Sequence, residues 1–190
     1  MVALVSIVVG LTIARTLASV LELVHHRHSI RIDWLPLVWT GNLLMWTVWF
    51  WWITFGLADQ AAAWEIRNLL FVLGYSAAIF FVLGVLYPSR IGPGFDFNEH
   101  FERNRRWFFG ALFVLAMFDV LDTTYRVING LVVPPPIYVA GLATLVLGSA
   151  LGWHLRSRRL DVAFAVVFAA FVAFQIVLAP GAIGPPPNTP

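Results

Sequence analysis

The stretch "WFFGALFVLAMFDVLDTTYRVINGLVV", residues 107–133, decides the fold class of this chain. It is predominantly apolar, and it exceeds the length of about 20 residues that an α-helix needs to cross a bilayer. Asp119, Asp122 and Arg126 nevertheless lie inside it. A charge that faces lipid at mid-membrane costs about 2.5–3.5 kcal/mol even on lenient insertion scales. We therefore predict a membrane-spanning helix whose charged face turns toward other helices.

The composition of the whole chain also indicates a membrane protein. Of its 190 residues, 60% are hydrophobic and 12% are charged, and the mean hydropathy is +0.82. A soluble domain carries about 25% charged residues. We predict an all-α, polytopic membrane protein with a single domain, residues 1–180, and a proline-rich polar tail, residues 181–190. The domain is expected to be a bundle of six transmembrane helices at about 3–26, 34–57, 67–88, 107–129, 136–154 and 160–179.

The segment "FDFNEHFERNRRWFF", residues 95–109, leaves two alternatives open. Phe97, Phe101 and Phe108 recur among charged residues at nearly helical spacing. This pattern is typical of a short amphipathic helix on the membrane surface, here within the 89–106 loop. The other interpretation is a solvated, positively charged loop.

The arginines predict the orientation of the bundle. The opposite side has only Arg67 and Arg126 near it, whereas the loops after the first, third and fifth spans hold most of the basic residues. By the positive-inside rule these loops are cytoplasmic, and both termini lie on the non-cytoplasmic side. Four features together, "GLTIARTLASVLELV", a tryptophan-rich second span, "RNRRWFFG" and "DVLDT", resemble small bacterial six-helix membrane proteins in general terms. We therefore expect the bacterial inner (cytoplasmic) membrane. The loop residues are Arg27, Arg31, Arg90, Arg103, Arg105, Arg106, Arg156, Arg158 and Arg159.

Several classes of chemistry are excluded by residue types that the chain lacks. It has no cysteine, and all 12 basic residues are arginine. Disulfides, thiolate metal sites, cysteine nucleophiles and lysine Schiff bases are therefore impossible. The sequence has no glycine-rich phosphate loop, serine nucleophile elbow or metalloprotease helix. We expect no enzyme, no nucleic acid partner and no metal site, and no motif names a cofactor.

Two predicted spans carry polar side chains along one face. In the first span these residues are spaced 3-4-3-4, and in the fourth span they are spaced 3-4-3. Each set therefore lies on a single helix face. We call these two faces the polar seam. The first face consists of Thr12, Arg15, Ser19, Glu22 and His26, and the second consists of Asp119, Asp122, Arg126 and Asn129.

Depth in the membrane predicts partners within the seam. At about 1.5 Å per residue, Arg15 and Asp119 lie about 18 Å and about 15 Å below the same surface. We therefore expect an Arg15–Asp119 pair, with Asn42 of the second span at a similar level. Asp122 is expected to pair with Arg126 along its own helix, and Glu22 to approach the arginine-rich loops. The seam is either a path for an ion or polar solute, or a structural device that fixes helix register.

Tryptophans in the second span form a further pattern. Trp39, Asn42, Trp46, Trp49 and Ile53 are spaced 3-4-3-4, so they form an aromatic wall at membrane depth. Such a wall lines a pocket for a quinone, carotenoid or lipid, or it packs against neighbouring helices. The sequence does not decide between these alternatives.

Small residues in the last two spans predict close helix contacts. Gly148 and Gly152 have GxxxG spacing, and Ala165 and Ala169 are also four residues apart. Small residues allow helix backbones to approach closely in membranes. The contact is either intramolecular or the interface of a homo-oligomer.

Two functions are consistent with these features. The first is a membrane protein that handles a small solute, ion or lipid, as a transporter or channel does, at the seam of Arg15, Asn42, Glu22, Asp119 and Asp122. The second is a non-catalytic accessory or scaffolding subunit of a larger membrane complex. Both functions place the chain in a lipid bilayer.

Overall fold

The computed structural model describes residues 2–58, 66–88, 91, 94–130 and 133–178. The predicted tail at 181–190 and Arg90 lie outside these residues. The described part is helical apart from its connections, which confirms the predicted all-α fold. The helices are α1 (Val2–His25), α2 (Trp34–Ala58), α3 (Ile66–Leu86), α4 (Phe97–Ile128), α5 (Pro136–His154) and α6 (Arg158–Leu178).

Five of the described helices, all except α2, are long and apolar enough to cross a membrane. With 25 residues, α2 also has the length, and it contains no acidic or basic residue. Its six tryptophans lower its hydropathy, because each indole carries a polar N–H group. The helices therefore have the character of a membrane-embedded bundle.

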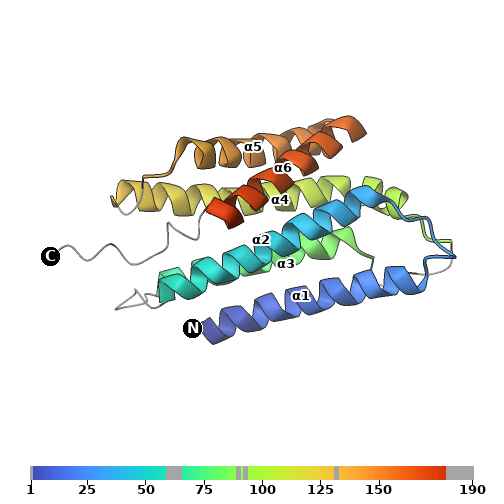
Figure 1. Ribbon diagram of the computed structural model, residues 1–190, viewed down its shortest axis with the longest axis horizontal. Helices are drawn as coiled ribbons and strands as arrows, with labels where there is room; N and C mark the ends of the chain where they lie inside the picture. The colour runs from blue at the N-terminus through green and yellow to red at the C-terminus, as the bar shows by residue number, and fades with distance from the viewer. Residues whose placement is uncertain (1, 59–65, 89–90, 92–93, 131–132, 179–190) are drawn as a thin grey trace.

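Successive helices run in alternating directions, so the chain returns with α6 toward the end from which α1 started (Figure 1). Helix α1 packs on α2 and α3, at one side of the bundle. Helix α4 packs on α3 and α5, whereas α6 packs on α2 and α5. Within the described residues, α1 and α4 make no direct contact. This order of neighbours decides which polar faces can meet.

Helix α4 begins ten residues earlier than the predicted span and includes most of the 95–109 segment. Asp96 caps its N-terminus, because the carboxylate accepts hydrogen bonds from the backbone N–H groups of Asn98 and Glu99, at 2.9 and 3.1 Å. Phe97, Phe101 and Phe108 are almost fully buried. The segment is thus amphipathic and helical, but it continues directly into the span instead of forming a separate surface helix.

The half of the bundle near the start of α4 has a dense aromatic core. Trp39 is completely buried in it. Its indole meets the rings of Phe108 and Phe164 edge-on, with 5.2 Å between ring centroids in both pairs. Phe168 lies beside it at 5.7 Å. Trp39 of the predicted aromatic wall therefore packs in the core.

A buried ion pair joins α4 to α6 beside this core. Arg105 donates from Nε and Nη2 to the two carboxylate oxygens of Asp161, at 2.9 and 2.6 Å, and both side chains are 2% exposed. The guanidinium also lies over the ring of Phe109, 5.0 Å from its centroid. The expectation that Arg105 belongs to a loop is wrong, because the early start of α4 carries it into the bundle.

The small residues of α5 face aromatic rings of the same chain. A Cβ atom at Gly148 would lie 2.5 Å from the ring of Phe164, and one at Gly152 would lie 2.5 Å from the ring of Phe109. In α6, Ala165 is fully buried and Ala169 is partly buried. The small residues therefore lie in intramolecular contacts, in which α5 packs against α4 and α6.

Candidate functional site

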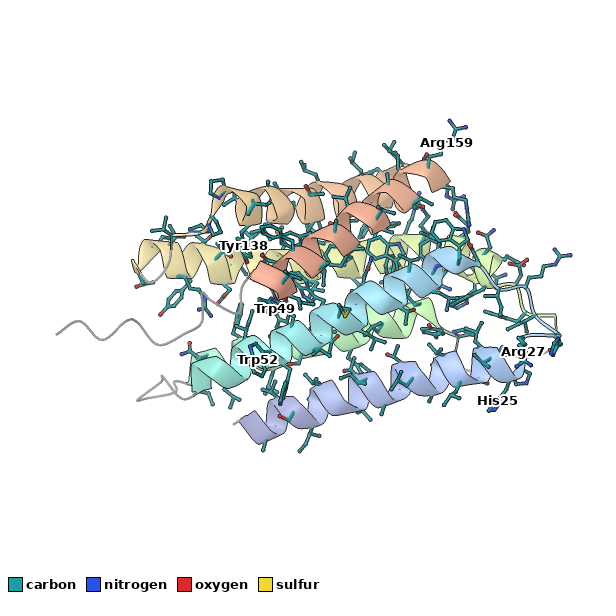
Figure 2. All side chains as sticks on the ribbon, viewed as in Figure 1. His25, Arg27, Trp49, Trp52, Tyr138 and Arg159 are labelled. Atoms are coloured by element: carbon teal, nitrogen blue, oxygen red, sulfur yellow. The ribbon has the colours of Figure 1, made fainter. Side chains whose placement is uncertain are left out.

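A cavity of about 150 Å³ lies in the half of the bundle away from the aromatic core. Figure 2 shows Trp49 and Tyr138 in this half, whereas His25, Arg27 and Arg159 project at the opposite end. Five helices contribute to its wall, and α1 does not. The lining residues are Trp46, Trp49, Phe50, Ile53 and Thr54 of α2, Phe71, Val72 and Tyr75 of α3, Asp119, Asp122 and Arg126 of α4, Tyr138 of α5 and Gln175 of α6.

A chain of two hydrogen bonds crosses the inner wall of the cavity. The indole Nε1 of Trp46 donates to the hydroxyl of Tyr75 at 2.8 Å, and that hydroxyl donates to Oδ1 of Asp119 at 2.9 Å. Trp46 and Tyr75 are 5% and 4% exposed. The chain connects α2, α3 and α4, so it fixes the position of the Asp119 carboxylate within the bundle.

The second oxygen of Asp119 has no hydrogen-bond partner among the described residues. Oδ2 is buried, and it accepts no hydrogen bond from any described residue. Buried polar atoms in proteins are almost always hydrogen-bonded, and a carboxylate oxygen is a strong acceptor. Asp119, a residue of the cavity wall, therefore has a buried acceptor that the described residues leave unused.

The outer part of the cavity carries an ion pair. Arg126 donates from Nε to Oδ2 of Asp122 at 2.7 Å, one turn apart on α4, which confirms the predicted pairing. These side chains are 31% and 38% exposed, in contrast to buried Trp46 and Tyr75. The cavity therefore deepens from the Asp122–Arg126 pair toward Asp119.

The predicted Arg15–Asp119 pair is wrong. Arg15 is exposed, and its guanidinium lies over the ring of Phe80 in α3, 5.0 Å from the centroid. Asp119 instead bonds to Tyr75. Matching depth was insufficient because α3 lies between α1 and α4, as the helix contacts require.

The other predicted seam residues are dispersed. Asn42 donates to the backbone carbonyl of Ala165 at 2.9 Å, between α2 and α6. Glu22 accepts from the backbone N–H of Ile91 at 3.1 Å, in the connection after α3. Ser19 donates to the backbone carbonyl of Arg15 in its own helix, at 3.1 Å. The structure thus brings together Asp119, Asp122 and Arg126 with Trp46 and Trp49, and leaves Arg15, Ser19, Glu22 and Asn42 outside the cavity.

The sequence pattern did not single out Tyr75 or Tyr138. Tyr75 is next to Ser76 in the apolar span "LLFVLGYSAAIFFVLGVL", residues 69–86, where a phenol is the largest polar group. Buried tyrosines generally find a hydrogen-bond partner for the hydroxyl, so Tyr75 was a detectable candidate. Tyr138 follows the proline run before α5, and its hydroxyl lies 3.1 Å from that of Thr123.

No protein family model matches this sequence, and neither curated proteins nor solved structures include a match. Function must therefore be inferred from the geometry of the chain itself. In the part that the structure describes, no three His, Asp or Glu side chains gather as ligands for a metal ion.

Proposed function

We propose that this protein handles a small solute within the membrane, at the cavity beside Asp119. The observation that carries the proposal is that Asp119 lines a cavity of about 150 Å³ and has one buried carboxylate oxygen, Oδ2, that bonds to no described residue. Ionisable residues within membrane spans are costly, and they commonly mark ion or substrate pathways. A solute with a hydrogen-bond donor or a positive charge would satisfy this acceptor.

Other buried charges of the bundle support this interpretation by contrast. Arg105 and Asp161 satisfy each other with two hydrogen bonds, and Asp33 receives two hydrogen bonds from Arg158. A carboxylate that served only to hold helices together would be expected to use both oxygens in the same way. Asp119 uses one oxygen to bond to Tyr75, whereas the other bonds to no described residue.

The proposal is tested by solute uptake into proteoliposomes. The panel contains labelled neutral, anionic and cationic molecules of a few non-hydrogen atoms. We expect Asp119-dependent uptake of at least one of them, reduced at least tenfold by Asp119→Asn at equal protein density in the membrane. Glu99→Gln is the matched control, because Glu99 is an exposed carboxylate that pairs with Arg103 outside the cavity. Uptake that is equal in wild type and Asp119→Asn for every solute contradicts the proposal.

The proposal includes location and orientation. We place the protein in a bacterial cytoplasmic membrane, with both termini on the non-cytoplasmic side. The support is the gathering of arginines at one end of the bundle, where Figure 2 shows Arg27 and Arg159, and the positive-inside rule. The cavity then lies in the non-cytoplasmic half. We propose no chemical conversion of the solute.

A second function, an accessory subunit of a larger membrane complex, is favoured by one observation. An apolar groove of about 400 Å³ runs over α3, α4 and α5 on the outside of the bundle. It combines the small residues Gly74, Ala78 and Ala111 with the exposed rings of Phe81 and Trp107, a surface suited to a partner helix. This second function is tested by purifying the protein in a mild detergent and measuring the mass of the purified particle. A much larger assembly supports this function, and a monodisperse single chain contradicts it.

A further inference from the structure

The cavity carries a net negative charge when Asp119 is ionised. Asp122 and Arg126 neutralise each other through their 2.7 Å bond. Among the described lining residues, Asp119 is the one carboxyl group outside that pair. A ligand with one positive charge would therefore leave the cavity neutral, whereas an anion would add a second negative charge to a site of low dielectric constant.

The donors of the inner wall are already in use. Trp46 donates to Tyr75, and Tyr75 donates to Asp119. The hydroxyl of Thr54 donates to the carbonyl of Phe50 at 2.9 Å. These three groups therefore have no donor left for an anion. Beside them, Oδ2 of Asp119 is a buried acceptor that bonds to no described residue.

Aromatic rings make up most of the remaining wall. Trp46, Trp49, Phe50, Phe71 and Tyr75 line the cavity together with Tyr138. Phe50 stacks on Tyr75 at a centroid distance of 4.4 Å, which holds both rings in place. Aromatic faces carry partial negative charge and attract ammonium groups, most strongly where water is excluded. Rings around a carboxylate are therefore suited to a cation with an apolar surface.

The volume limits the size of such a cation. A cavity of 150 Å³ in another protein holds benzene, a molecule of about six non-hydrogen atoms, and the cavity here is of similar size. We propose that the cavity binds a small organic monocation, a protonated or quaternary amine, whose charge lies against Asp119 and whose alkyl groups contact the rings. This inference rests on the proposed function and names its substrate class.

Three probes of similar size and different charge test the inference. Tetramethylammonium, tert-butanol and acetate are titrated against the full chain in lipid nanodiscs, and binding is followed by saturation-transfer NMR. We expect tetramethylammonium to bind, and its Kd to rise at least tenfold in Asp119→Asn and stay within twofold in Glu99→Gln.

Unchanged tetramethylammonium binding in Asp119→Asn overturns the inference. Asp119-dependent binding of tert-butanol or acetate, without tetramethylammonium, also overturns it but leaves the proposed function intact. If none of the three probes binds and no solute shows Asp119-dependent uptake, both the inference and the proposed function are overturned.

The cysteine-free chain allows a second measurement that does not need a stable complex. A single cysteine replaces Thr54, a lining residue that is 4% exposed. Its thiolate attacks a methanethiosulfonate reagent, forms a mixed disulfide and releases methanesulfinate. The rate with the trimethylammonium-ethyl reagent is divided by the rate with the sulfonatoethyl reagent. We expect Asp119→Asn to lower this ratio at least tenfold.

Ser29→Cys is the matched control for the thiol reactions, because Ser29 is exposed in the connection between α1 and α2. Its ratio should not change with Asp119→Asn. The inference is overturned if Asp119→Asn also leaves the ratio of the two reagent rates at Thr54→Cys unchanged, whatever the stability of the variant.

Discussion

At the scale of single residues, the two carboxylate oxygens of Asp119 have different surroundings. Tyr75 donates to one oxygen, and the other is buried without a partner among the described residues. A site that only stabilised the fold would gain from satisfying both oxygens. A buried acceptor without a hydrogen-bond partner costs stability.

Asp119→Asn is therefore expected to preserve stability. The asparagine side-chain oxygen can still accept from Tyr75, and the variant removes a buried charge, so the free energy of unfolding should stay within about 1 kcal/mol of wild type or rise. Thermal unfolding in detergent measures it. A loss of about 3 kcal/mol or more would instead indicate that the ionised carboxylate is a structural partner.

Tyr75→Phe is expected to destabilise the bundle. The hydroxyl is the shared partner of Trp46 and Asp119, so its removal leaves a buried donor and a buried acceptor unpaired. We expect a loss of about 1–3 kcal/mol in the free energy of unfolding.

Tyr87→Phe is the comparison for Tyr75→Phe, since its hydroxyl lies 2.8 Å from that of Thr40, and Thr40 retains a bond to the carbonyl of Pro36. We expect Tyr87→Phe to lower the free energy of unfolding by less than Tyr75→Phe does. Equal losses for the two variants would contradict the role of Tyr75 as a bridge between helices.

At the scale of helices, the sequence predicted most boundaries but not the neighbours. Apolar runs bounded by proline, glycine and arginine predicted the ends of five spans to within about two residues of the helix ends in the structure. The start of α4 was missed because Glu99, Glu102 and Arg103 resemble a loop, whereas Phe97, Phe101, Arg105 and Phe108 share a buried helix face. Periodicity shows which face of a helix turns inward, but it does not show which helix that face meets.

The polar seam shows this limit most clearly. Spacing correctly predicted the Asp122–Arg126 pair, because both residues belong to one helix. The Arg15–Asp119 pair depended on the order of helices around the bundle, which no local pattern contains. The cavity combines side chains from five helices, so it could not be predicted before that order was known.

The Arg105–Asp161 pair is expected to be a major link between α4 and α6. Asp161→Asn leaves the buried guanidinium without a carboxylate, so we expect a loss of about 3–5 kcal/mol in the free energy of unfolding. The exposed pair Arg103–Glu99 is the control, and Glu99→Gln should cost about 0.5 kcal/mol or less. Similar losses for the two variants would show that the pair is not buried in the membrane-embedded protein.

The link between α6 and the connection before α2 is expected to depend on pH. Hydrogen bonds from Arg158 lower the pKa of Asp33, with burial opposing them and the backbone N–H of Leu35 adding to them. The unfolded pKa of aspartate is about 3.9, so this contribution to stability is complete above that pH. It is lost as the pH falls through the lower folded pKa.

Asp33→Asn provides the check on this pH dependence. Unfolding temperatures measured from pH 6 to pH 2 should fall less steeply in the variant than in wild type. Parallel profiles would contradict the linkage.

At the scale of the whole molecule, the two halves of the bundle differ. The half near the connections of α1 to α2 and α5 to α6 has arginines, the buried Arg105–Asp161 ion pair and a filled aromatic core. The other half has the cavity and a single partly exposed ion pair among its described lining residues. This asymmetry predicts one firmly packed end and one end at which a solute enters.

Orientation is tested by labelling intact cells with a membrane-impermeant maleimide. Single cysteines replace Ser29, at the arginine-rich end, and Asn129, an exposed residue at the C-terminal end of α4. We expect labelling of Asn129→Cys and protection of Ser29→Cys until the cells are lysed. The reverse pattern would place the cavity in the cytoplasmic half.

The central claim is that Asp119 and its cavity form a solute site. The most direct test is the ratio of initial uptake rates of wild type and Asp119→Asn in proteoliposomes of equal protein content, measured for each solute of the panel. We predict a ratio of at least ten for one or more solutes, with Glu99→Gln close to wild type. A ratio near one for every solute would contradict the claim.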